Sequence, residues 1–176
     1  GAVGNGALGR TLESLGSHDL DGLDLRLMCA EDTFDAAREC LRNVSGVAHH
    51  FQVDRLTQPR GPFPSTEELV AAGLARSQDS ALHGWVMPGD VIGSETLTQL
   101  RRALLHHPEA AWAVAGTTPS VDPSLRGCLL RDPRPAAFLY RREAADQVGG
   151  LDPSLGPGMG WNLWLRLALQ WPAIQV

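Results

Sequence analysis

Apolar residues recur along the chain at two alternating spacings. Leu8, Leu12 and Leu15 recur every three or four residues, which is the period of an amphipathic helix. A compact apolar run follows at 23–29, as expected of a strand buried in a sheet. Continued along the chain, the pattern predicts helices over 7–15, 33–43, 65–77, 94–107, 142–148 and 161–169, and strands over 23–29, 47–53, 81–86, 111–115, 138–140 and from 173.

Local chemistry supports several of these boundaries. Ser65 and Glu68 form a capping-box pattern at the start of one helix, and Thr33 is the predicted cap of another. The four prolines of 117–135 predict an irregular connection there. Two sets of side chains are predicted to face the core, namely Leu97, Leu100, Leu104 and Leu105 on the helix over 94–107, and Trp161, Trp164, Leu165 and Ala168 on the last helix.

The alternation of strands and helices is typical of an α/β fold, in which helices flank a twisted, mostly parallel sheet in three layers. The apolar strand over 81–86 is predicted to be central and parallel, with Trp85 near its end and Asp90 in the loop that follows. No repeat and no linker composition interrupts the pattern, so 1–176 is expected to form a single domain. Ligands bind such sheets at the carboxyl ends of the strands, so candidate residues are those that follow each strand.

Composition narrows the functional classes. The chain has 176 residues, 43% hydrophobic and 20% charged, which is typical of a globular protein and not of a disordered one. A net charge of −5 argues against binding to nucleic acid, and no apolar run approaches the roughly 18 residues of a membrane span. Cys29, Cys40 and Cys128 lack the spacing of a zinc site or of a paired disulfide framework, which predicts buried thiols in a cytoplasmic protein.

A glycine motif near the start has two interpretations. Gly4, Gly6 and Gly9 match the GxGxxG pattern of dinucleotide-binding proteins, and Glu31 and Asp32 stand where a ribose-binding acid is expected. Only three residues precede the motif in this sequence, too few for the strand that normally positions it. The glycines therefore predict either a dinucleotide site or a glycine-rich loop.

Two pairs of adjacent histidines do not predict a metal site. If 47–53 is a strand, His49 and His50 point to opposite faces and cannot bind one ion together. His106 and His107 fall in the last turn of a helix, where imidazole suits the negative end of the helix dipole.

Longer motifs in the second half of the chain are more specific. They are HGWVMPGDV at 83–91, HPE at 107–109, FLYRR at 138–142, VGGLDPSL at 148–155 and WNLWLRLA at 161–168. Together with LGRTLESL at 8–15, they resemble the family 2 inverting glycosyltransferases, which have the GT-A fold. The resemblance covers nearly the whole chain and implies a GT-A-like domain that is clipped at both ends.

The resemblance also implies where the nucleotide and the metal would bind. The family holds the nucleotide base with an aspartate pair after the second strand; here Cys29 and Ala30 stand there, followed by Glu31 and Asp32. Ala30, Glu31 and Asp32 are therefore the candidate nucleotide-binding residues. The family's metal-binding acidic cluster falls on residues 87–90, where only Asp90 is a carboxylate and hence the candidate metal ligand.

The catalytic acidic residues of the family fall on Gly160 and Asn162, neither of which can accept a proton. We therefore expect a catalytically degenerate domain that binds a nucleotide-sugar, a glycan, or another domain or subunit. One alternative is an active nucleotide-sugar-dependent transferase that uses Asp90 with Mg²⁺ or Mn²⁺. A weaker alternative is a dinucleotide-binding domain built on Gly4, Gly6 and Gly9.

Overall fold

The computed structural model describes residues 5–44, 46–57, 64–116, 122–130, 135 and 137–176. The chain divides into two compact units: unit 1 comprises 1–79 and 86–94, and unit 2 comprises 80–85 and 95–176. The expectation that 1–176 forms a single domain stays a prediction. No helix in the described part of the chain is long and apolar enough to cross a bilayer.

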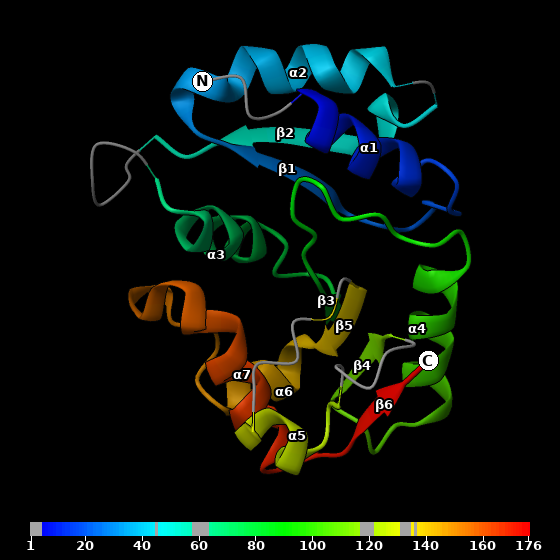
Figure 1. Ribbon diagram of the computed structural model, residues 1–176, viewed down its shortest axis with the longest axis vertical. Coiled ribbons are helices and arrows are strands. Elements are labelled where there is room, and N and C mark those ends of the chain that lie inside the picture. Colours follow the sequence, from blue (N-terminus) through cyan, green and yellow to red (C-terminus); the bar gives the residue numbers. More distant parts are fainter. Residues whose placement is uncertain (1–4, 45, 58–63, 117–121, 131–134, 136) are drawn as a thin grey trace. The chain divides into compact units, whose positions relative to one another are not determined.

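Unit 1 is a parallel strand pair covered by helices (Figure 1). Its elements are α1 (Asn5–Leu15), β1 (Leu25–Cys29), η1 (Glu31–Thr33), α2 (Phe34–Asn43), η2 (Ala48–His50), β2 (Phe51–Arg55) and α3 (Thr66–Arg76). The two strands pair in register from Leu25 opposite Phe51 to Cys29 opposite Arg55. Their carboxyl ends therefore lie together, at Cys29 and Arg55.

Each face of this strand pair is covered. Side chains of α1 and α2, among them Leu12 and Leu41, pack on the face that carries Phe51. The opposite face carries Met28, against which α3 places Gly73 so closely that a Cβ there would lie 2.9 Å from the Met28 Cγ. Helices therefore cover both faces of this two-stranded sheet.

Unit 2 is built on a mixed sheet with strand order β3-β5-β4-β6 (Figure 1). Its elements are β3 (Leu82–His83), α4 (Thr96–His106), β4 (Trp112–Ala115), α5 (Leu125–Leu130), β5 (Ala137–Arg141), α6 (Arg142–Gln147), η3 (Pro153–Gly158), α7 (Met159–Ala168) and β6 (Ala173–Gln175). The core beside α5, α6 and α7 is aromatic, and includes Trp112, Phe138, Tyr140 and Trp164.

The expectation of a mostly parallel sheet is wrong. Within the described residues β1 pairs with β2, and β4 with β6, in parallel, whereas β5 is antiparallel to both β3 and β4. The prediction of a central parallel strand over 81–86 is also wrong, because only Leu82–His83 is a strand and it lies at an edge of its sheet. Strand direction depends on pairing between distant segments, which the local apolar pattern does not encode.

Smaller differences also have local causes. The strand predicted over 47–53 begins only at Phe51, because Ala48–His50 forms a 3₁₀ turn with the rings of His49 and His50 4.0 Å apart. Part of the connection over 117–135 is the helix α5. The Thr33 hydroxyl donates to the Ala30 carbonyl and does not cap α2.

Two side chains predicted to face the core are exposed. Leu105 has 77% of its surface exposed because it lies on α4 away from Leu100 and Leu104, which are buried as predicted. Trp161 is 38% exposed, whereas Trp164 on the same helix is buried as predicted.

Candidate functional site

The candidate nucleotide-binding residues lie at the carboxyl end of β1. Ala30 is the N-cap residue of η1, and its carbonyl accepts the backbone N–H of Thr33 at 3.2 Å. Glu31 and Asp32 are in the first turn of η1 and are exposed. Ala30, Glu31 and Asp32 are thus placed where ligands approach parallel strands, and their role in binding a nucleotide stays a prediction.

The sequence analysis missed a basic and aromatic group at this same edge. Arg55 ends β2 and donates from its guanidinium to the Glu31 carboxylate at 2.5 Å. The Arg55 guanidinium also lies over the Phe34 ring, with its Cζ 4.7 Å from the ring centre, and Arg38 lies 5.7 Å from the same centre. The two arginines over the Phe34 ring place positive charge at the same edge of the strand pair as Glu31 and Asp32.

The strand end itself offers no reactive thiol. Cys29 is the last residue of β1 and is 5% exposed. Burial, with a smaller contribution from the negative charge of Asp54, raises the pKa of the Cys29 thiol to about 11. A thiol with so high a pKa stays protonated near neutral pH and is a poor nucleophile or metal ligand.

Asp90, the candidate metal ligand, closes a tight turn, hereafter the 87–90 turn. Its carboxylate Oδ2 accepts the backbone N–H of Met87 at 2.9 Å, and its own N–H donates to the Met87 carbonyl at 3.0 Å. Gly89 has φ +108°, a conformation that residues with a side chain rarely adopt. One carboxylate oxygen of Asp90 is therefore engaged in holding the backbone.

The 87–90 turn is fixed to α1. The Thr11 hydroxyl donates to the Asp90 carbonyl at 2.8 Å and accepts the N–H of Gly89 at 2.9 Å. One turn further along α1, the Ser14 hydroxyl accepts the N–H of Ile92 at 3.1 Å. Thr11 and Ile92 are each 3% exposed, so these bonds are shielded from water.

These residues do not fit a Mg²⁺ or Mn²⁺ site. Such ions need several hard oxygen ligands, and the side chains of Met87, Pro88 and Gly89 supply none. In the described ranges of the chain, no group of three or more His, Cys, Asp or Glu side chains could hold a metal ion.

The two positions at which the family places its catalytic acids lie at the start of α7. Asn162 accepts the Arg166 Nε–H through its Oδ1 at 2.8 Å. The Arg166 guanidinium also donates to the carbonyls of Val148 and Gly150 and so holds the backbone at 148–150. Asn162 therefore helps to orient the Arg166 side chain. A side-chain amide is not a base near neutral pH, and the expectation that position 162 has no part in catalysis stays a prediction.

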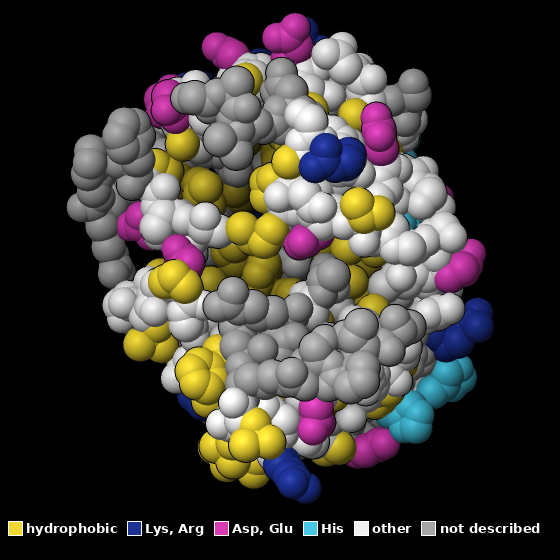
Figure 2. All heavy atoms as spheres, in the orientation of Figure 1, with side chains coloured by type: hydrophobic (Ala, Val, Ile, Leu, Met, Phe, Trp, Pro, Cys, Tyr) yellow, Lys and Arg dark blue, Asp and Glu magenta, His cyan; other side chains and the backbone are white. Residues whose placement is uncertain are grey.

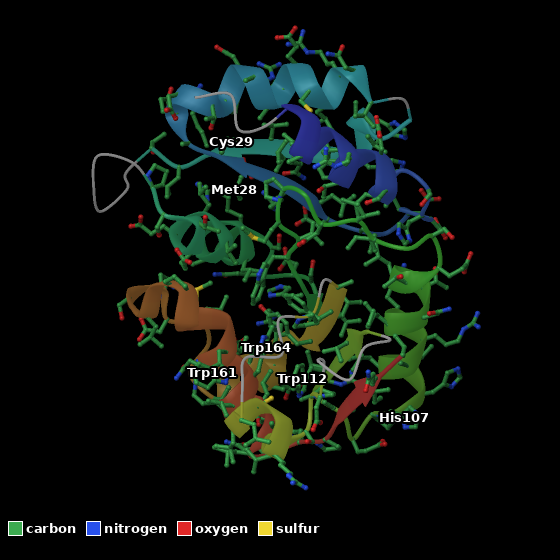
Figure 3. The ribbon with its side chains drawn as sticks, viewed as in Figure 1. Met28, Cys29, His107, Trp112, Trp161 and Trp164 are labelled. Carbon is green, nitrogen blue, oxygen red and sulfur yellow. The ribbon has the colours of Figure 1, made fainter. Side chains whose placement is uncertain are left out.

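Gly160 lies against an aromatic stack. Trp164 stacks on Trp85 with ring centres 5.5 Å apart and on Trp112 at 4.9 Å, with interplanar angles of 12° and 4°. A Cβ at Gly160 would lie 3.4 Å from the Trp85 ring and 3.6 Å from the Trp164 Nε1. Trp164 and Trp112 are labelled in Figure 3, which shows them side by side in unit 2. These are ordinary van der Waals distances, so a side chain at position 160 would contact the stack.

Of the glycine motif, only part is described. Gly4 lies outside the described residues, and Gly6 and Gly9 are inside α1. A Cβ at Gly9 would meet only the Cys40 Sγ at 4.0 Å, which is an ordinary contact. In dinucleotide-binding proteins the third glycine allows close packing of helix and strand, and Gly9 meets no such requirement here.

The sequence analysis missed Arg55 and the contacts of Thr11, and only the first of these could have been found from a local pattern. Arg55 could have been found by placing the second strand two residues later, since it is then the residue at the strand's end. The contacts of Thr11 with the 87–90 turn join segments almost eighty residues apart, and no local pattern predicts them.

Comparisons with known proteins give one clear result. No family model matches the sequence, and no curated protein matches it either. A solved structure, mannosyltransferase PcManGT from Pyrobaculum calidifontis in complex with GDP-Man and Mn²⁺, matches over 99% of this chain with a TM-score of 0.73 at 14% identity. The chain spans about half, 52%, of that protein's length. At this identity the match concerns the fold alone. The chain adopts a glycosyltransferase-like fold.

Proposed function

We propose that this chain is a glycosyltransferase-like domain, related to family 2 and of GT-A type, that binds its ligand without transferring a sugar. The observation that carries the proposal is the 87–90 turn. Its single carboxylate, Asp90, bonds to the Met87 N–H, and the turn is fixed to α1 by Thr11. An oxygen engaged in this way is poorly available to a cation, and the turn supplies no other carboxylate.

The positions of the expected general base support the same conclusion. Deprotonation of an acceptor hydroxyl needs a carboxylate or an equivalent base within hydrogen-bond reach. Gly160 has no side chain, and the Asn162 amide is bonded to Arg166. Without a base at these positions, a bound donor would receive no help in the transfer step.

Ligand binding is better supported than catalysis. The mannosyltransferase with the similar fold binds GDP-Man, so a nucleotide-sugar is the first ligand to test, ahead of a free glycan or a protein subunit. In this chain Glu31 and Asp32 would hold the nucleoside. Arg38 and Arg55, whose guanidinium groups both lie over the Phe34 ring, could offset phosphate charge without a metal. We also propose that the protein is cytoplasmic, as the scattered cysteines of the sequence indicate.

An active transferase is the second candidate, and one finding favours it. The similar mannosyltransferase was solved with Mn²⁺ together with GDP-Man. If this chain works in the same way, Asp90 would be its remaining metal ligand, and Asp90→Ala would abolish turnover.

Titration of the whole chain with GDP-mannose and UDP-glucose, followed by calorimetry in Mn²⁺ or in EDTA, tests the binding. We expect binding that is equal in the two conditions and that weakens in Arg55→Ala but not in the surface control Arg76→Ala. Binding that requires Mn²⁺ would contradict the proposal. Binding of NADH in place of the diphospho-sugars would instead support the dinucleotide alternative.

A donor-hydrolysis assay in Mn²⁺ tests catalysis separately. We expect no release of nucleoside diphosphate above the rate without protein. Turnover that disappears in Asp90→Ala would overturn the proposal and identify an enzyme.

A further inference from the structure

A groove of about 510 Å³ lies on unit 2, beside the edge strand β6 (Figure 1). It is lined by 122–125 at the start of α5, by 168–172, which connects α7 to β6, and by Ala173 and Gln175 of β6 itself. A space of this volume is in the range of small-molecule sites in proteins. All of the lining belongs to unit 2 and none of it to the proposed nucleotide-binding residues, so the groove is a separate candidate site.

The groove has an aromatic surface. Trp171 is half-buried, because it packs against the core that includes Trp112 and Trp164 and also lines the groove. Its backbone N–H donates to the Leu167 carbonyl at 2.9 Å, and the exposed Pro172 follows it. An indole that the core already holds in place offers apolar surface to a ligand with little further loss of side-chain entropy.

Two amide side chains accompany this tryptophan. Gln170 and Gln175 are both exposed and line the groove. The Gln175 Nε2 donates to the Gly116 carbonyl at 2.6 Å, which orients the amide and leaves its Oε1 as an acceptor. A primary amide both donates and accepts hydrogen bonds, as a ligand hydroxyl does. The pair therefore suits a ligand that carries several hydroxyl groups.

A carboxylate and a hydroxyl belong to the same lining. The Asp122 Oδ1 accepts the Ser124 N–H at 3.0 Å, and the Ser124 hydroxyl accepts the Gly127 N–H at 3.1 Å. A Cβ at Gly127 would lie 2.4 Å from the carboxyl carbon of Asp122, so the missing side chain of Gly127 allows Asp122 to lie against α5. These contacts hold both polar side chains in place at the groove.

The charge of the groove does not suit an anionic ligand. Among the described residues that line it, Asp122 alone is charged. Arg126, which follows Leu125, is exposed but is not part of the lining. Figure 2 shows arginine and histidine side chains of unit 2 gathered instead over α4, at the right of the view. A phosphate or carboxylate in the groove would therefore face Asp122 without a cation to pair with.

We propose that this groove binds a neutral glycan, with a pyranose ring packed on Trp171. A pyranose has an apolar face of C–H groups and a rim of hydroxyls, which matches an indole beside two amides, a carboxylate and a hydroxyl. A peptide matches less well. An added strand would need backbone pairing, and β6 offers only Ala173–Gln175, preceded by Pro172.

NMR titration of the whole isotope-labelled chain tests the proposal. The probes are mannotriose, maltotriose and cellotriose, which are neutral and differ in hydroxyl orientation or linkage. We expect at least one of them to shift the indole N–H signal of Trp171, which is identified by its absence in Trp171→Phe. GDP, which is anionic, should leave that signal unchanged.

Variants locate the binding. Trp171→Ala should weaken trisaccharide binding about tenfold, as loss of an aromatic anchor does. Gln170→Ala should weaken it about threefold, the effect of one lost hydrogen bond. Gln170 is exposed, so this variant tests the groove even if Trp171→Ala does not fold. Circular dichroism reports the folding of each variant.

Matched controls are Gln99→Ala, an exposed glutamine of α4, and Trp161→Ala, a partly exposed tryptophan of α7 outside the lining. Both should bind trisaccharide like the unmodified protein, and so should Arg55→Ala, which alters only the proposed nucleotide site. Absence of a shift with all three trisaccharides, or an equal loss in the controls, would overturn the proposal. A shift with GDP would contradict the neutral ligand. A larger shift with a Thr-Val hexapeptide than with any trisaccharide would overturn the proposal in favour of strand addition.

Discussion

At the scale of single residues, the environment of Trp164 explains why this position is structural. Its ring is 2% exposed and stacks on Trp85 and Trp112. Phe138 and Tyr140 meet it edge-on, at centre distances of 4.7 and 6.1 Å. Stacked and edge-on pairs of aromatic rings contribute more than their buried area alone, so much of the unit 2 core depends on this one side chain.

Replacing Trp164 with alanine should lower the free energy of unfolding by about 3–5 kcal/mol, the usual cost of removing a large buried aromatic side chain. Urea denaturation followed by circular dichroism measures the change. Trp164→Phe, which keeps a ring in the stack, should lose clearly less. Normal stability in Trp164→Ala, together with loss of a sugar ligand, would instead identify the ring as a binding platform.

At the scale of elements, the contact between α1 and 86–94 shows how a loop acquires a fixed conformation without regular structure. Thr11 is buried in α1 and bonds to both Gly89 and Asp90 of the 87–90 turn. Ile92 follows in the same segment and is buried too. Side-chain hydroxyls of a helix replace the backbone pairing that a strand would have supplied.

Thr11→Val keeps the shape of the side chain but removes the hydroxyl, which leaves the Gly89 N–H without its bond. We expect the free energy of unfolding to fall by about 1–3 kcal/mol, the cost of an unsatisfied buried polar group. Thr11→Ser, which keeps the hydroxyl, should recover most of that loss. A Thr11→Val protein as stable as the original, by urea denaturation, would show that the 87–90 turn is held by other contacts.

At the scale of the whole molecule, the positions at which the resembling family carries its metal ligands and its base belong to different units. The position expected for the metal, Asp90, belongs to unit 1, and the positions expected for the base, Gly160 and Asn162, belong to unit 2. Groups that act together in catalysis do not contribute additively, so one restored group does not restore a share of the rate.

Asn162→Asp should therefore give no hydrolysis of GDP-mannose in Mn²⁺. The new carboxylate would also pair with Arg166, which already donates to position 162, and an ion-paired carboxylate is a weaker base. The released nucleoside diphosphate is the quantity to measure. Turnover in this variant would show that the metal-binding position is already functional, which would contradict the proposed loss of activity.

Local patterns in the sequence are sufficient to predict most of the helices and several of the strands. Helical periodicity and the capping box at Ser65 placed α1, α2 and α3 to within a few residues, and the apolar run before Cys29 placed β1. Periodicity and capping are properties of neighbouring residues, so no tertiary contact is needed to predict them. The family motifs likewise indicated a glycosyltransferase-like fold, to which the similar mannosyltransferase structure corresponds.

The direction and position of the strands, and the surroundings of the candidate site residues, depend instead on contacts between distant segments. β3 is short, antiparallel and at an edge because its backbone pairs with β5, some sixty residues away, from Leu82 opposite Arg141. Thr11 meets Asp90, and Arg55 meets Glu31, through folding of the chain and not through spacing. Apolar pattern reports that a residue is buried, whereas the identity of its partners depends on which distant segments pack together.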